Sequence, residues 1–112
     1  MLNKDLMAAT IRPAVLAVLA QRESYGYEII KEVRVLSNEQ VEWAEGALYP
    51  MLHRMERHGL IESYWRTADN GRKRKYYRLN NSGQKELDNQ KAQWKVATAL
   101  LNKVWGPEPC LT

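Results

Sequence analysis

Residues 46–79 constrain the fold of this 112-residue chain most, because the hydrophobic period changes once within them. The apolar residues of the first half recur at the spacing of one helix face: Leu48, Met51, Leu52 and Met55. Tyr, Trp and Ile then enrich residues 61–66 and 75–79, as in strands, and an Asn-Gly turn signal lies between the two runs. We therefore expect a helix over about residues 45–58, followed by a β-hairpin with a charged tip.

The same segment carries the excess positive charge of the chain. It holds eight Lys and Arg residues against three acids, a net charge of +5, whereas the whole chain is +4 and the remainder is therefore −1. Charge that is concentrated on one helix and the hairpin after it is typical of a protein that binds a polyanion. The alternative is a solvated helix face and a solvated hairpin, which the four basic residues 72–75 would favour if they stood alone.

Two more helices are expected before this segment. Helical spacing of apolar residues predicts the first over residues 5–21. Pro13 then requires either a start near Arg12 or a kink, because proline lacks a backbone N–H. Ser24 is placed to cap a second helix over residues 25–36.

A long last helix is expected over residues 82–105. Its apolar residues lie at heptad spacing: Leu87, Trp94, Ala97, Leu101 and Val104. No later element can bury this stripe, so it requires the body of the protein or a second copy of the chain. Because helix-turn-helix proteins commonly bind DNA as dimers, we expect these residues to form the interface of a homodimer.

The expected fold class is α+β, mostly α with a small β-hairpin. Three helices, a hairpin and a long helix indicate a winged helix-turn-helix with a C-terminal dimerisation helix. The expected division is a DNA-binding domain over residues 1–80, the dimerisation helix over 81–105 and a flexible tail over 106–112.

This fold predicts double-stranded DNA as a partner. The third helix would enter the major groove with the face opposite its apolar one: Tyr49, His53, Arg54 and Arg57. The hairpin would contact adjacent phosphates or the minor groove through the basic run Arg72, Lys73, Arg74 and Lys75, releasing counterions. Strand alternation predicts that one residue of each aromatic pair, 64–65 and 76–77, lies in the core.

Catalytic, metal and membrane functions find little support. His53 and His58 have no other ligands around them, and the single Cys110 has no positioned base. No catalytic residue, metal or cofactor is expected. The chain begins without the apolar core of a signal peptide, and its longest apolar run, residues 13–20, is too short to span a bilayer. We therefore expect a cytoplasmic protein that does not bind membranes.

Five motifs, in order along nearly the whole chain, resemble those of the PadR family of bacterial transcriptional regulators. They are residues 25–29 (YGYEI), 46–50 (GALYP), 55–61 (MERHGLI), 71–79 (GRKRKYYRL) and Gly83 before Leu87. The resemblance adds Tyr25, Gly46, Ala47 and Pro50 to the expected DNA-binding residues. Ala47 stands where the family commonly has Thr, so a hydroxyl that could contact phosphate is absent. The family implies a homodimeric repressor that an effector releases from DNA.

The single C-terminal helix is similar to that of the short, multidrug-binding branch of this family. There, a Trp of the last helix and its symmetry mate hold a planar aromatic ligand, and Trp94 falls at the matching position. The resemblance places these residues around the same pore: Leu6, Ala9, Pro13, Ala17 and Thr98. Thr98 replaces an acid, so we expect a neutral or weakly acidic aromatic effector rather than a cation. The alternative is that Trp94 only anchors the dimer.

A different class of function also stays open. A winged helix can serve as a protein-interaction module that no longer binds DNA. The basic hairpin argues against this alternative, and a salt-dependent shift of promoter DNA distinguishes the two.

Overall fold

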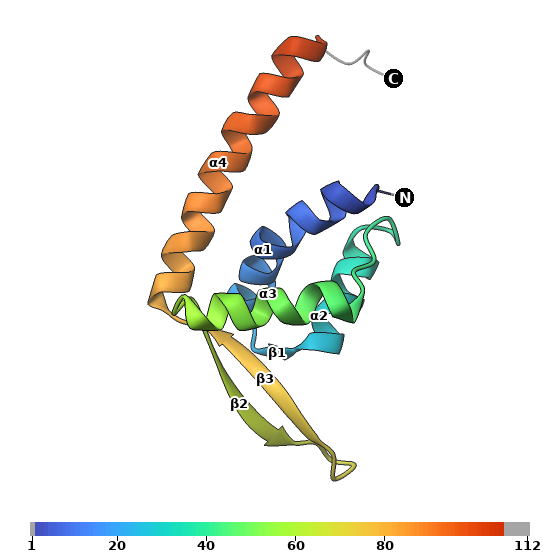
Figure 1. Cartoon of the computed structure of the whole chain (residues 1–112), viewed down its shortest axis with the longest axis vertical. Helices are drawn as coiled ribbons and strands as arrows, with labels where there is room; N and C mark the ends of the chain where they lie inside the picture. Colours follow the sequence, from blue (N-terminus) through green and yellow to red (C-terminus); the bar gives the residue numbers. More distant parts are fainter. Residues whose placement is uncertain (1, 107–112) are drawn as a thin grey trace.

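A computed structural model describes residues 2–106 and contains four helices and three strands (Figure 1). In chain order they are α1 (Lys4–Gln21), β1 (Ser24–Tyr25), α2 (Gly26–Leu36), α3 (Glu45–Arg57), β2 (Ile61–Thr67), β3 (Lys73–Leu79) and α4 (Asn81–Trp105). The first three helices pack together, the β2–β3 hairpin extends from one side, and α4 extends from the other. This arrangement confirms the predicted α+β winged helix-turn-helix. The predicted flexible tail falls, after residue 106, outside the described residues.

The core lies where α1, α2 and α3 meet the inner face of the sheet. Its most buried members come from all of these elements: Val15, Leu16, Ile29, Leu48, Leu52, Met55, Ile61 and Tyr77. Trp43, in the connector before α3, is also buried, and its indole Nε1 donates to Thr10 Oγ1 at 3.1 Å. That bond satisfies the polar atom of a buried ring and ties the connector to α1.

The sheet is antiparallel, with strand order β1-β3-β2. Ser24 is fully buried and pairs with Tyr77 of β3, while Tyr25 occupies the N-cap position of α2 without a side-chain cap bond. The prediction that Ser24 caps α2 is therefore wrong. Local sequence favours Ser as a cap, but pairing with a strand more than fifty residues later decides its conformation.

Pro13 lies inside α1, which begins at Lys4. Asn3 caps the helix by accepting from the Leu6 N–H at 2.9 Å. The alternative of a start near Arg12 is therefore wrong.

α4 begins at a tightly packed corner beside the sheet. Asn80 accepts from the Gly83 N–H at 2.8 Å, which caps the helix. A Cβ added at Gly83 would lie 2.2 Å from the Leu60 carbonyl oxygen, so only glycine fits there. Beyond this corner, residues 91–105 are all exposed within the single chain, and Figure 1 shows α4 leaving the body. None of the helices between residues 2 and 106 is long and apolar enough to cross a membrane.

Candidate nucleic-acid interface

α3 has the orientation that its periodicity predicts. Leu48, Leu52 and Met55 are fully buried, while His53, Arg54 and Arg57 are exposed on the opposite side. Gly46, Ala47 and Pro50 are exposed toward the start of the helix. α3 therefore presents two arginines and a histidine to solvent on a rigid support.

Tyr49 is the exception among the residues expected to point outward. Its ring is half-buried against the core, and a Cβ added at Gly26 would lie 2.7 Å from its hydroxyl oxygen. Burial, and then the nearby Glu45 carboxylate, raise the pKa of the Tyr49 hydroxyl. The prediction that Tyr49 points away from the core is therefore wrong, because residues three apart are neighbours on a helix surface and Tyr49 lies beside Leu52.

A groove of ≈ 370 Å³ lies between α3 and the hairpin. Its lining combines aromatic rings with basic side chains: Tyr25, Gly26, Tyr49, His53, Trp65, Lys73, Arg74, Lys75 and Tyr77. Trp65 is 67% exposed, although alternation predicts one core residue in each aromatic pair. The expectation holds for Tyr77, which is buried, and is wrong for residues 64–65, because β2 extends beyond the core at that point. Sequence reasoning did not assign Trp65 to the interface.

The cations of this surface differ in whether an acid already neutralises them. Lys75 lies 4.0 Å from Glu56, and Arg78 lies 3.0 Å from Glu62. Within the described part of the chain, the remaining cations of α3 and the hairpin have no carboxylate within 4.0 Å: Arg54, Arg57, Arg66, Arg72, Lys73 and Arg74. Such cations are available to neutralise phosphates.

Glu56 couples α3 to the hairpin. Its carboxylate accepts a hydrogen bond from the Ser63 hydroxyl of β2 and lies beside the Lys75 ammonium of β3. One residue near the end of α3 thus holds both strands. The hairpin is therefore oriented relative to the exposed face of α3.

Three tyrosines and three arginines cover the outer face of the sheet. Tyr76 contacts Tyr25 and Tyr64 on either side, with ring centroids 5.4 and 5.9 Å apart. The guanidinium of Arg74 lies 4.5 Å from the Tyr25 ring centroid. Tyr25, predicted to bind DNA, thus supports a basic side chain of the hairpin. The Tyr64 hydroxyl donates to Glu23, which raises the pKa of that hydroxyl.

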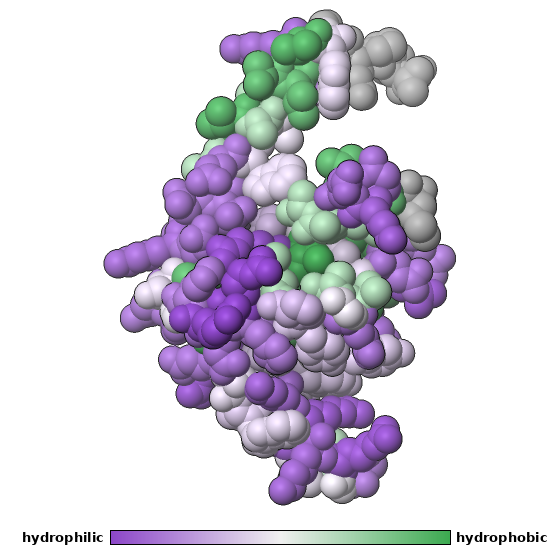
Figure 2. Space-filling view, in the orientation of Figure 1, coloured by the Kyte–Doolittle hydropathy of each residue, from purple (hydrophilic) through white to green (hydrophobic). Residues whose placement is uncertain are grey.

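The predicted dimer stripe divides along α4. Leu87 is 3% exposed and belongs to the core of its own chain, so its assignment to the dimer interface is wrong. It lies one turn after the packed corner at Gly83, where the body still covers the helix. The later residues Trp94, Ala97, Leu101 and Val104 are exposed. Figure 2 shows apolar side chains gathered on this distant half of α4.

The predicted effector residues do not form one site in the single chain. The Thr98 hydroxyl donates to the Trp94 carbonyl at 2.8 Å and so is used within α4. Leu6 and Ala9 are exposed, and Pro13 is half-buried. Ala17 lines an apolar groove of ≈ 310 Å³ between α1 and α2.

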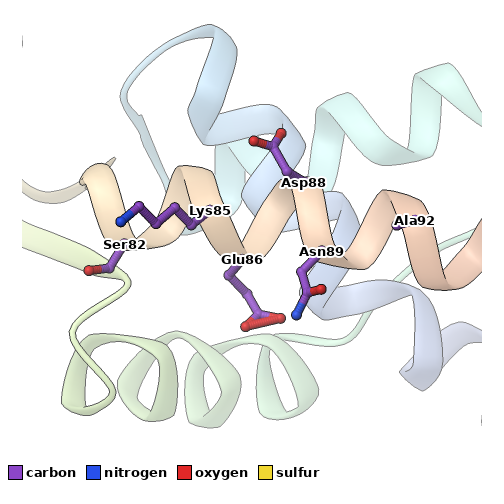
Figure 3. A pocket seen from close by; sticks show the side chains of 6 residues that line it. All are labelled: Ser82, Lys85, Glu86, Asp88, Asn89 and Ala92. Atoms are coloured by element: carbon purple, nitrogen blue, oxygen red, sulfur yellow. The ribbon is translucent and has the colours of Figure 1, made fainter.

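A cavity of ≈ 540 Å³ lies elsewhere, along the polar side of α4 (Figure 3). All of its lining residues come from this one helix: Ser82, Lys85, Glu86, Asp88, Asn89 and Ala92. Figure 3 shows Glu86 and Asn89 on one side of the helix and Asp88 on the other, so these groups do not converge. Among residues 2–106, no three His, Cys, Asp or Glu side chains are grouped so that they could hold a metal ion.

The fold and its basic helix–hairpin surface define a winged helix-turn-helix regulator that binds DNA. Residues 15–89 match the sequence model of the Transcriptional regulator PadR-like family. The chain belongs to that family.

Two relatives span most of the chain. A transcriptional regulator from Mycobacterium tuberculosis is 32% identical over 88% of this chain and 89% of its own length. An uncharacterised protein from Lysinibacillus sphaericus is 30% identical over 91% and 94%.

Solved structures agree with the fold. A transcriptional regulator from Clostridium thermocellum superimposes with a TM-score of 0.83 at 29% identity, covering 92% of this chain and 97% of that one. A PadR family transcription regulator from Clostridium difficile has a TM-score of 0.73 at 35% identity, covering 86% and 98%.

Proposed function

We propose that this protein is a homodimeric repressor. It binds operator DNA through the exposed face of α3 and through the β2–β3 hairpin, and a small planar aromatic effector releases it. The observation that carries the DNA contact is the set of unneutralised cations on these two adjacent elements. The proposed contacts are Arg54, Arg57, His53, Arg72, Lys73 and Arg74, with Gly46, Ala47 and Pro50 at the start of α3.

The proposed dimer contact is the distant half of α4. Trp94, Leu101 and Val104 are exposed there in the single chain, and water contact with such large apolar groups is unfavourable. A second copy that buries them also places two recognition helices on one DNA. Half-sites on the operator lie about one turn apart, ~34 Å, which a lone subunit cannot span.

The proposed effector site is formed by Trp94 and its symmetry mate. Paired indoles suit a planar aromatic because offset stacking adds to the energy of area burial. Thr98 is neutral and Lys91 and Lys95 lie nearby on α4, so a cationic ligand gains no advantage. The ligand releases DNA only if it binds the free dimer more tightly than the DNA-bound one.

The DNA-binding part of this proposal is tested by selecting bound sequences from a pool of random duplexes. The recovered operator is then titrated by fluorescence anisotropy at several salt concentrations. We expect a single consensus with two half-sites and an affinity that falls steeply with salt. Failure to recover any sequence, with no salt-dependent binding, would instead favour a protein-interaction module.

The effector part is tested with neutral, anionic and cationic planar aromatics. We expect tryptophan fluorescence quenching that Trp94→Ala removes, and weaker operator binding in the presence of the same compound. Trp43, Trp65 and Trp105 also emit, so the Trp94→Ala protein supplies the background signal. Equal binding by both proteins would leave Trp94 a packing residue. We further propose that this repressor acts in the cytoplasm and not as an enzyme.

A further inference from the structure

Two arginines face each other on the outer face of the hairpin. Arg66 of β2 and Arg74 of β3 are direct partners in the strand register. Like charges directly opposite on a sheet repel each other and are destabilising. Between residues 2 and 106, neither guanidinium has a carboxylate within 4.0 Å. This pair therefore carries two charges that the chain leaves uncompensated.

Tyrosine rings fix the position of both side chains. The Arg74 guanidinium lies 4.5 Å from the Tyr25 ring centroid, and that of Arg66 lies 5.0 Å from the Tyr76 ring centroid. The two rings contact each other edge to face, with centroids 5.4 Å apart. A guanidinium that stacks on a ring keeps its in-plane N–H donors for another partner. The arginines are thus ordered before any ligand binds.

A polar hollow lies beside this pair. Its volume is ≈ 400 Å³, and it is lined by both arginines, Tyr76 and the hairpin tip, residues 67–70. Asp69 is the one acid in the lining, so the two arginines leave a net charge of +1. Asn70 is already occupied, because its side-chain oxygen accepts from the Arg72 N–H at 3.0 Å.

We propose that Arg66 and Arg74 clamp one phosphate of the DNA backbone against the outer face of the hairpin. The inference rests on the proposed DNA-binding function and adds a contact that the exposed face of α3 does not reach. Two planar guanidiniums match the oxygens of a phosphodiester, and the repulsion between them is relieved when an anion lies between them. DNA is favoured over an acidic protein because Arg72 and Lys73 lie on the same hairpin.

The position of the clamped phosphate follows from strand alternation. Side chains of adjacent residues point to opposite faces, so Arg66 lies on the face opposite Trp65. Trp65 lines the groove toward α3, Arg66 lines the outer hollow, and Arg74 lines both. The phosphate therefore belongs to DNA that flanks the bases under α3, and a shortened operator would lack it.

Arg78 provides a matched control on the same face. It lies on the same strand as Arg74, its guanidinium is 5.4 Å from the Tyr64 ring centroid, and it has a similar aromatic support. Its Nε donates to Glu62 at 3.0 Å, so its charge is already compensated. Arg78→Gln removes an arginine and a ring contact without removing an uncompensated charge.

The experiment compares full-length wild type, Arg66→Gln, Arg74→Gln, the double variant and Arg78→Gln on a long and a shortened operator duplex. On the long duplex, each single clamp variant should reduce the slope of log affinity against log salt. One phosphate per subunit corresponds to about 1.8 units per dimer. The double variant should lose little more than either single one, because both arginines hold one phosphate. Arg78→Gln should keep the wild-type slope. On the shortened duplex, Arg66→Gln should match wild type.

Phosphate ethylation interference gives a second readout. Wild type should show an interfering phosphate outside each half-site. Arg66→Gln should lose that signal and keep all the others. The unfolding temperature of Arg66→Gln without DNA should be unchanged or raised, because a repulsion between two arginines is removed. This result would exclude misfolding as the cause of weaker binding. If wild type binds DNA and Arg66→Gln matches Arg78→Gln in slope and interference, the clamp is overturned while the proposed function stands. If wild type binds no duplex, the proposed function itself fails and the clamp fails with it.

Discussion

α3 and α4 are both amphipathic helices, but only α3 buries most of its apolar side within its own chain. Leu48, Leu52 and Met55 of α3 are fully buried. On α4 only Leu87 reaches the core, and Trp94 and Leu101 are 38% and 40% exposed. α3 thus offers its polar face to an external partner, whereas α4 offers its apolar face. The difference supports the proposals that α3 contacts a polyanion and that α4 contacts another apolar surface.

The largest effect should come from a charge placed on the apolar side of α4. Leu101→Asp would bury a carboxylate in the proposed dimer contact, at a cost of several kcal/mol per subunit if it stays ionised. We expect a monomeric or aggregated protein that no longer binds the operator, as measured by analytical ultracentrifugation and anisotropy. Asn102→Asp, one residue along the same helix, is the control and should remain a dimer. Wild type sedimenting as a monomer at micromolar concentration would refute the assignment of α4.

Heptad spacing identified most of this surface but not its extent. It grouped Leu87 with Trp94 and Leu101, because a periodic stripe does not reveal whether its partner is the chain's own body or a second copy. The close contact of Gly83 with Leu60 and Leu79 determines which partner each residue has. It holds only the start of α4 against the body of the protein. Val96, Leu100 and Trp105 are exposed as well, so the apolar surface of α4 is wider than the stripe.

The sequence predicted the orientation of α3 and the hairpin well for a related reason. Leu48, Leu52 and Met55 are spaced for one helix face, and an apolar face of this kind is buried whichever elements cover it. Ser24 and Tyr49 were placed wrongly because their surroundings come from distant segments, β3 and Gly26. Trp65 was missed because nothing in the sequence tells where the hairpin passes beyond the core.

The next largest effect concerns the basic hairpin that accompanies α3. Arg72→Ala combined with Lys73→Ala removes two uncompensated cations per subunit, or four per dimer. The salt slope of DNA binding should then shrink by up to about 3.6 units for all sequences alike. The control is the pair Lys4→Ala on α1 and Lys85→Ala on α4, both of which are also exposed. A slope that falls equally in the control would show that the effect is one of net charge and not of the hairpin.

A smaller effect is expected where α3 meets α2. A methyl group added by Gly26→Ala would lie 2.7–2.8 Å from three atoms of the Tyr49 side chain, so the ring must move. Overpacking of this kind costs about 1–3 kcal/mol, measurable by urea unfolding. Gly46→Ala is the control, because an added Cβ there has no atom within 4 Å and alanine favours a helix.

A double variant sharpens this prediction. In a Tyr49→Ala background the clash is absent, so Gly26→Ala should cost little. An equal loss of stability in both backgrounds would mean that Gly26 is required by its backbone conformation and not by the Tyr49 ring. Tyr49→Ala itself should lower stability as well as DNA affinity, since the ring is half-buried.

The smallest expected effect is a pH dependence of the free energy of unfolding. It comes from a tyrosine buried beneath α3, and the exposed half of α4 contributes no such dependence. Burial, and then the charge of Glu56, raise the pKa of the Tyr77 hydroxyl above its ordinary value of 10.0. Below about pH 10 the ring is neutral in both the folded and unfolded chains, so stability does not depend on it. Above that pH the unfolded chain releases the proton first, and stability falls by at most about 1.4 kcal/mol per pH unit.

Urea unfolding at pH 9 and at pH 10.5 measures this loss. Tyr77→Phe should reduce the difference between the two pH values, although not abolish it, because the pKa of Tyr49 is raised for similar reasons. Tyr27→Phe, at an exposed position on α2, is the control for the loss of a tyrosine hydroxyl. If Tyr77→Phe and Tyr27→Phe behave alike, Tyr77 ionises as easily in the folded chain as in the unfolded one. The interior beneath α3 would then be more accessible to water than its packing indicates, and the contrast with α4 would be weaker.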